Sequence, residues 1–377
     1  MESFDSIKDI AGIENAIEIQ KKKLAALREE VKKLTFKKID IAGNYASVSY
    51  KAIDGGNMKI SLNPFEMNVV NVADSNGKKK LSFVIPEIKG YGESADEKEQ
   101  AKSSIIKEVD KNAIIQRFLK LLNCSSIADI SYLLVDSNNF MEIAEWACIF
   151  DRVNMENDEP IIIIKDGLLR TKVLAASDKK NYIKELKKIL KDKKKNAKLV
   201  GVSKTSAIIS LLSTAIFLEK KIPAESIGYI KIPLDLELRA YKWDGKGEIK
   251  KEEMQPLNFA FGELYIAKLA KDSNLLVTIE VPKDLETGID IYSESEIIEM
   301  ISYLAKDSKY SYPVLGYPQT IMRAHETAVQ LGFPASVIKD EIKDKIIASM
   351  GEEVGEFIRD AWLITDYVNK GVLGGGA

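Results

Sequence analysis

The spacing of hydrophobic residues along the chain changes repeatedly and predicts an alternation of helices and strands. In residues 13–35, apolar side chains recur at spacings of three, four and seven among lysines and glutamates, which predicts an amphipathic helix. Residues 45–56 alternate with a period of two and end in glycines, which predicts a strand that stops at a turn. Residues 67–74 and 80–88 predict two further strands, joined by a hairpin-like turn. We expect the first helix either to form a short coiled-coil or dimer arm, or to pack on its own domain.

The remaining pattern continues this mixture. Helices are predicted at 112–122, 140–150, 178–195, 207–218, 294–305, 318–332 and from 336 onward. Strands are predicted at 161–167, near 198–203, and at 227–232, 237–243, 259–269 and 275–281. The run of four isoleucines that begins at Ile161 is typical of a strand buried on both faces.

Strands interleaved with helices predict an α/β fold, with a mostly mixed sheet, helices on both of its faces and helical additions at both ends. We expect an N-terminal helical arm over residues 1–36, a core domain over 37–335 and a C-terminal helical extension over 336–377. A chain of 377 residues with 45% hydrophobic residues can bury a substantial core. The apolar residues of 362–368 are expected either to meet a partner helix or to cap the fold.

Charge and composition exclude several classes of protein. The 55 basic and 57 acidic residues nearly balance, which argues against a nucleic-acid coat or a membrane-surface protein. The acidic start lacks the apolar run of a secretory signal, and the apolar stretch 207–218 is too short to span a bilayer, so no membrane association is expected. Cys124 and Cys148 provide neither a disulfide framework nor a zinc site. We therefore expect a cytoplasmic protein.

Two aspartates occupy similar places in the pattern. Asp54 follows the apolar row of its strand and precedes two glycines, whereas Asp166 shares a face with Ile162 and Ile164 and precedes Gly167. Taken alone, Asp54 is better interpreted as the opening of a turn, because Asp-Gly is a common hairpin signal. Because α/β proteins place sites at the carboxyl ends of strands, the two carboxylates are also candidates for a shared Mg²⁺ or Mn²⁺ ion.

Other residue types that suit a metal or phosphate site lie further along the chain. Glu145 borders the apolar face of its predicted helix, whereas Glu142 is expected to be more exposed, so we favour Glu145 as a third acid. Lys204 lies in a segment that only loosely matches a phosphate-binding loop, because the glycines of a Walker motif are missing. Tyr317 and His325, the only histidine, lie eight residues apart and can approach one site. An imidazole there suits manganese or a phosphate, although a structural role is also open.

Taken in order, the segments AIDGG, MEIAEWA, IIIIKDGLL, GVSKTS and GYPQTIMRAHETA resemble the NurA nuclease family. They extend from Asp54 to His325, and Gly-Tyr-Pro followed by Ala-His-Glu is the most specific of them. Two departures are visible: Gly56 and Leu168 stand where a small hydroxyl residue is common. Neither removes a ligand.

The resemblance implies a ribonuclease H-like core, related to the Piwi module, that cuts DNA with Mn²⁺ or Mg²⁺. It implies a 5′-to-3′ exonuclease with single-strand endonuclease activity, usually a homodimer, that works with a HerA-type hexameric ATPase in DNA end resection at double-strand breaks. Carried over by position, Asp54 and Asp166 match the metal-binding aspartates. Tyr317 and His325 match the C-terminal motif, and Lys204 matches the usual lysine less closely.

We therefore expect metal-assisted hydrolysis of phosphodiesters, in which Asp54, Asp166, Glu145 and His325 hold the ion or ions. Lys204 and Tyr317 are expected to contact phosphate. The lysines between 187 and 195 are expected to follow the DNA backbone or simply to form a solvated face. Two alternatives are a non-catalytic DNA-binding adaptor of a translocase and another ribonuclease H-like metal nuclease of the resolvase type.

Overall fold

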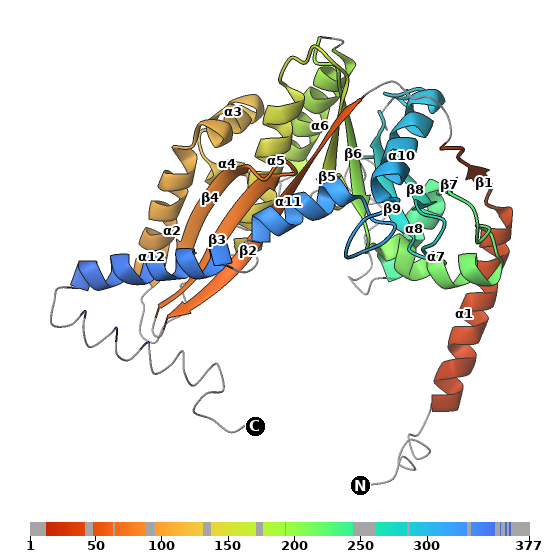
Figure 1. The fold of residues 1–377 in the computed structure, drawn as a ribbon, viewed down its shortest axis with the longest axis horizontal. Coiled ribbons are helices and arrows are strands. Elements are labelled where there is room, and N and C mark those ends of the chain that lie inside the picture. Colours follow the sequence, from red (N-terminus) through yellow and green to blue (C-terminus); the bar gives the residue numbers. More distant parts are fainter. Residues whose placement is uncertain are drawn as a thin grey trace, which may run out of the picture. The chain divides into compact units, whose positions relative to one another are not determined.

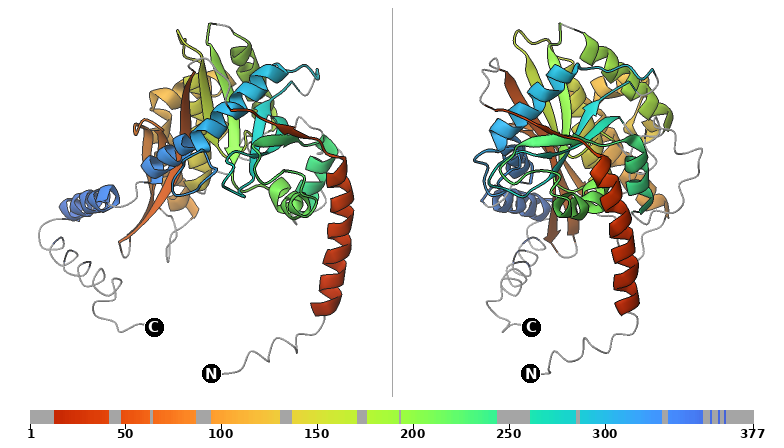
Figure 2. Two further views of the ribbon diagram at one scale, coloured as in Figure 1. Left: turned by 45° about the vertical axis from the view of Figure 1, so that its right-hand side comes forward. Right: turned by 90° about the vertical axis from the view of Figure 1, so that its right-hand side faces the viewer.

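A computed structural model provides the coordinates of the protein (Figures 1 and 2). The structure describes residues 13–41, 48–62, 65–86, 95–130, 137–170, 176–192, 194–243, 261–284, 287–329, 333–350 and the single positions 355, 359 and 362. The chain divides into two compact units. Unit 1 comprises Met1–Val48, Lys165–Arg170 and Leu199–Gln319, and unit 2 comprises Ser49–Ile164, Thr171–Lys198 and Thr320–Ala377.

Unit 2 is built around an antiparallel series of strands. These are β2 (Ser49–Leu62), β3 (Phe65–Asp74) and β4 (Lys79–Pro86), and β5 (Ile161–Asp166) is the neighbour of β2 on the other side. Its helices are α2 (Ala95–Asp110), α3 (Ala113–Leu122), α4 (Ile127–Ile130), α5 (Ser137–Val153), α6 (Ala176–Lys191), α11 (Gln319–Val329) and α12 (Phe333–Met350). The turn predicted between the second and third strands joins β3 to β4.

Both faces of the unit 2 strands are covered by helices (Figure 1). Helix α5 packs on β2, β3 and β4, with α3 and α6 outside it. The aromatic rings of Phe118, Trp146 and Tyr182 join these three helices edge to face. On the opposite face, α12 and the buried Trp362 cover Ile60 of β2. Trp362 thus packs on the fold, and residues 363–368 of the same predicted segment lie outside the described residues.

The strands of unit 1 are paired in the order β1-β7-β8-β9-β6-β5, and those of unit 2 follow the order β5-β2-β3-β4. Strand β5 appears in both orders because its residues are divided between the two units. The elements of unit 1 are α1 (Ile13–Lys33), β1 (Phe36–Lys38), β6 (Ala197–Ser203), α7 (Ala207–Leu218), β7 (Gly228–Lys231), α8 (Leu234–Trp243), β8 (Gly262–Lys268), β9 (Val277–Pro282) and α10 (Glu294–Ser308). Both units thus combine strands with helices, in agreement with the predicted α/β class.

The core of unit 1 lies between β7 and β8 and the helices α1, α7 and α8. Val31 of α1, Leu212 of α7, Leu236 of α8 and Ile266 of β8 are among its buried residues. The C-terminal half of α1 therefore packs on its own unit, whereas Ile17, near its start, is 47% exposed. The opposite face of these strands carries the start of α10, which shares a cavity of about 490 Å³ with Tyr229 and other residues.

Two predicted features are wrong. The strand that was expected to stop at Gly55 and Gly56 runs through both of them as β2, because these glycines serve close packing against helices. Residues 237–243, predicted as a strand, belong to α8. That helix begins after Pro233 with acidic residues in its first turn, which are helix-start signals that outweigh the short alternating pattern.

Candidate functional site

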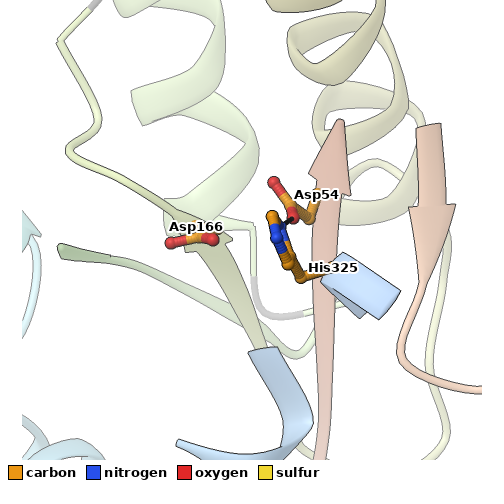
Figure 3. Close-up of side chains that lie close together, drawn as sticks. All are labelled: Asp54, Asp166 and His325. Atoms are coloured by element: carbon orange, nitrogen blue, oxygen red, sulfur yellow. Dashed lines mark hydrogen bonds and ion pairs between the residues drawn. The ribbon is translucent and has the colours of Figure 1, made fainter. Parts of the chain in front are cut away.

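Asp54 and His325 form a hydrogen-bonded pair in unit 2. Asp54 lies within β2, opposite Ala73 of β3, and only 7% of its side chain is exposed. Nδ1 of His325, on α11, lies 2.8 Å from Oδ2 of Asp54 (Figure 3). A carboxylate so little exposed is costly unless a donor or cation offsets its charge, and the imidazole does so here. The imidazole itself is 37% exposed, so the pair is accessible from solvent.

Gly56 sets the position of α11 above this pair. It lies two residues after Asp54 and therefore on the same face of β2. A Cβ built on Gly56 would lie 2.4 Å from the carbonyl carbon of Ala328, which is closer than real Cβ contacts. Because His325 precedes Ala328 by three residues, it lies on the same side of the helix, one turn away. The missing side chain of Gly56 lets α11 approach until the imidazole meets the carboxylate.

Glu145 approaches β2 from the α5 face. Its Oε1 accepts a hydrogen bond of 2.7 Å from the backbone N–H of Gly55, the residue that follows Asp54. A Cβ on Gly55 would lie 2.6 Å from that same oxygen and from Cγ of Met141. As expected, Glu145 is the buried acid of the helix, and Glu142 is more exposed. The buried carboxylate thus fixes the backbone next to Asp54, and its role as a metal ligand stays a prediction.

Asp166 occupies the end of β5 and belongs to unit 1. Here the strand does stop at the glycine, because Gly167 has a φ of +95° and its N–H donates to Val202 O at 2.7 Å. The hydroxyl of Tyr317 donates to Oδ1 of Asp166 at 2.5 Å. Tyr317 is completely buried. The tyrosine hydroxyl therefore holds the carboxylate in one orientation.

Lys204 is exposed and rests on the ring of Tyr317, with its Nζ 5.5 Å from the ring centroid. This is the geometry of a cation–π contact. Two residues after Lys204, Ser206 caps α7 by accepting a hydrogen bond from the N–H of Ile209. Lys204 is thus a solvent-facing ammonium group beside the tyrosine that holds Asp166.

Within each unit, the structure brings predicted site residues together. Unit 2 joins Asp54, Glu145 and His325 around one segment of β2, and unit 1 joins Asp166, Tyr317 and Lys204 around the end of β5. Figure 3 draws Asp54 and His325 of unit 2 and Asp166 of unit 1, each of which offers one atom of a type that binds metal ions.

Sequence reasoning missed the supporting role of Gly55 and Gly56. Two adjacent glycines in a buried strand are a signal for close approach on both faces, because adjacent positions point in opposite directions. The small residues Ala324 and Ala328, four apart on α11 and both fully buried, are the matching signal on the helix.

The lysine-rich helix α6 is amphipathic. Lys188 is exposed, whereas only 8% of Lys187 is exposed. Contact of this face with DNA stays a prediction. Across the described residues, no helix combines the length and apolar character needed to cross a membrane.

Comparisons with known proteins assign the chain to a family. The NurA domain matches residues 49–330, which is most of the chain. Comparison with curated protein sequences finds no match.

Among solved structures, the chain is similar to the NurA nuclease from Sulfolobus solfataricus, with 14% identity, a TM-score of 0.46, and coverage of 92% of this chain and 98% of that one. It is also similar to a NurA structure bound to dAMP and manganese, with 10% identity, a TM-score of 0.43, and coverage of 93% and 99%. These structural likenesses are too weak to place any residue, and the domain match carries the assignment. The chain belongs to the NurA family.

Proposed function

We propose that this protein is a metal-dependent phosphodiesterase that hydrolyses DNA. The observation that carries the proposal is the Asp54–His325 pair, a nearly buried carboxylate held 2.8 Å from an accessible imidazole within a NurA domain. The family membership supports a nuclease.

The residues present fit a divalent ion such as Mn²⁺ or Mg²⁺. Asp54, Asp166 and His325 would supply two carboxylates and one imidazole, a donor set that suits manganese. Strand β5 is the neighbour of β2, and Asp166 is its last residue. Asp166 comes only two residues after Ile164, which is the last residue of β5 that belongs to unit 2. Two residues of strand extend about 7 Å, so we propose that the end of β5 carries Asp166 to the same ion. Glu145 is the remaining candidate ligand.

The ion, when bound, would supply an activated water and neutralise charge on the phosphate oxygens. The chain's own groups would then have separate tasks. The Tyr317 hydroxyl would keep Asp166 in one rotamer, and His325 would orient Asp54 or bind the ion through its other nitrogen. Lys204, exposed beside Tyr317, would attract a phosphate of the substrate.

The test is hydrolysis of end-labelled single-stranded and double-stranded DNA, with and without Mn²⁺. We expect wild type to cut only with the metal, and Asp54→Ala and Asp166→Ala to lose cutting. Asp158→Ala, which removes an exposed loop carboxylate elsewhere, is the matched control and should cut like wild type. The proposal is wrong if wild type leaves DNA intact with every metal tested, or if the Asp54→Ala and Asp166→Ala variants cut DNA as well as wild type does.

We further propose the finer properties that the family resemblance implies. These are a ribonuclease H-like core, 5′-to-3′ exonuclease and single-strand endonuclease activity, a homodimer, and cooperation with a HerA-type hexameric ATPase in end resection. Digestion of DNA labelled at one end or the other tests the polarity. Light scattering tests the dimer, and co-elution with such an ATPase tests the partnership.

A further inference from the structure

Two tyrosine rings stand almost free in solvent just before the Tyr317 motif. Tyr310 is 82% exposed and Tyr312 is 79% exposed. They lie in a segment of residues 309–316, named here the tyrosine loop, which connects α10 to Tyr317. Exposed apolar residues are common singly, but a tyrosine ring that is left in water forgoes a large burial energy. Two such rings within three residues indicate a surface that another molecule covers.

The backbone of the tyrosine loop is held firmly in place. Ser311, between the two rings, is buried, and its Oγ donates to Val314 O at 2.8 Å and accepts from the N–H of Gly316 at 3.2 Å. The N–H of Tyr312 donates to Oε1 of Gln319 at 2.7 Å. Ser273 Oγ donates to Leu315 O at 2.8 Å. Because the loop is already ordered, a ligand that covers the rings loses little conformational entropy in binding.

The charge beside the rings suits a nucleic acid. Nζ of Lys309 lies 4.9 Å from the centroid of the Tyr310 ring. An aromatic ring that carries an ammonium group over one face can stack a base on its other face, while the positive charge attracts phosphate. Base stacking on aromatic rings tolerates any sequence. Only five residues after Tyr312, Tyr317 holds Asp166 with its hydroxyl, so the loop leads directly into the candidate site of the same unit.

We propose that Tyr310 and Tyr312 are a stacking platform for the unpaired bases of single-stranded DNA. The proposal rests on the proposed nuclease function and deepens it by naming the part of the substrate that the loop binds. The bases of an intact duplex stack on each other and present no free faces, so the platform selects single-stranded DNA or a frayed end.

The test is fluorescence anisotropy of a labelled oligothymidylate with the full chain in EDTA, where binding is measured without cleavage. Replacing both rings by Tyr310→Ala and Tyr312→Ala should weaken binding about fivefold or more, in line with the stacking contribution of aromatic residues. The pair Tyr310→Phe and Tyr312→Phe keeps the stacking faces and should bind like wild type. Phe217→Ala is the matched control. It removes a half-exposed aromatic ring elsewhere in unit 1 and should also bind like wild type.

A second arm uses an abasic oligomer of the same length. It should bind wild type and the double alanine variant equally, because both retain the phosphate contacts. Unchanged oligothymidylate binding in the double alanine variant, or an equal loss with the abasic oligomer, overturns the platform. The melting temperature of each variant should match that of wild type, since both rings are exposed. If wild type binds through the tyrosines but never cuts DNA in Mn²⁺, the nuclease proposal fails and the platform stands. If wild type cuts DNA but its binding does not depend on the tyrosines, the platform fails and the nuclease proposal stands.

Discussion

Gly56 lies against the backbone of Ala328, so close that an added Cβ would be 2.4 Å from the Ala328 carbonyl carbon and 2.5 Å from its oxygen. This approach places His325, one turn earlier in α11, on the carboxylate of Asp54. A small hydroxyl side chain, which the family resemblance leads us to expect at position 56, has no room in this chain.

Gly56→Ala should therefore push α11 away from β2. We expect the free energy of unfolding to fall by about 1–3 kcal/mol, the usual cost of overpacking, and Mn²⁺ affinity to fall with it. Urea unfolding and calorimetric Mn²⁺ titration measure the two effects. Adding Ala328→Gly should not restore either quantity, because the clash is with the backbone of residue 328. A rescue by that second change would show that side-chain crowding, rather than backbone contact, fixes the helix.

His325→Asn should separate metal binding from turnover. If the imidazole completes the proposed ion site, Mn²⁺ affinity should fall about tenfold or more, since even partners of metal ligands contribute that much. Calorimetry of Mn²⁺ binding and the kcat for DNA hydrolysis give the two readouts. Glu326→Gln, at the exposed neighbouring position, is the control. Loss of turnover with unchanged Mn²⁺ affinity would instead assign the histidine to positioning phosphate or water.

Tyr317→Phe should lower activity through Asp166. The change keeps the buried ring and the contact with Lys204 but removes the hydroxyl that donates to Oδ1 of Asp166. A hydrogen bond to a charged group contributes about 1.5–3 kcal/mol, so kcat/KM should fall about tenfold or more. Tyr265→Phe, which removes a hydroxyl bonded to Glu263, is the matched control and should change stability without changing kcat/KM. Equal activity of both variants would contradict the positioning role.

Glu237 should make stability depend on pH above the acidic range. It lies buried against Arg170, whose Nη1 is 2.7 Å from Oε1 of Glu237 and whose Nη2 is 3.0 Å from Oε1 of Glu280. Burial, assisted by the nearby charge of Glu280, raises the pKa of Glu237 from 4.5 to about 7, although Arg170 acts in the opposite direction. Folding thus favours the protonated form, and this contribution to stability, complete below pH 4.5, is lost as the pH rises through 7.

The difference between these pKa values corresponds to about 3 kcal/mol. Relative to Glu237→Gln, wild type should lose up to about that much stability between pH 4 and pH 8, measured by urea unfolding at a series of pH values. Glu225→Gln, at an exposed position of the same unit, should follow wild type at every pH. A constant difference between wild type and Glu237→Gln would refute the raised pKa.

Long periodic segments made most of the fold predictable. The apolar spacing of α1, the isoleucine run of β5 and the turn between β3 and β4 each carry a local signal that tertiary packing reinforces. The strand predicted at 237–243 failed because a short apolar alternation fits helix and strand alike, and the helix start at Pro233 settles the choice. Strand order depends on pairings between distant segments, such as β1 with β7, which no local pattern contains.

The candidate site was predictable in its residue types but not in its supports. Asp54, Asp166 and His325 could be singled out because acids and a lone imidazole have few structural uses beside buried strands. The hydrogen bond from Tyr317 to Asp166 joins residues 151 positions apart and could not be foreseen from spacing. The sequence Asp-Gly-Gly favours a turn, whereas in the structure helices crowd both faces of the strand at these two glycines.

The single histidine gives this protein a natural spectroscopic reporter. Its imidazole protons are the only ones in the chain, so one pair of proton resonances can be assigned to His325 without isotope labelling or mutagenesis. Because that ring is hydrogen-bonded to Asp54, the chemical shifts of this pair report directly on the candidate site. Events at one position in 377 residues can thus be observed in the unmodified protein.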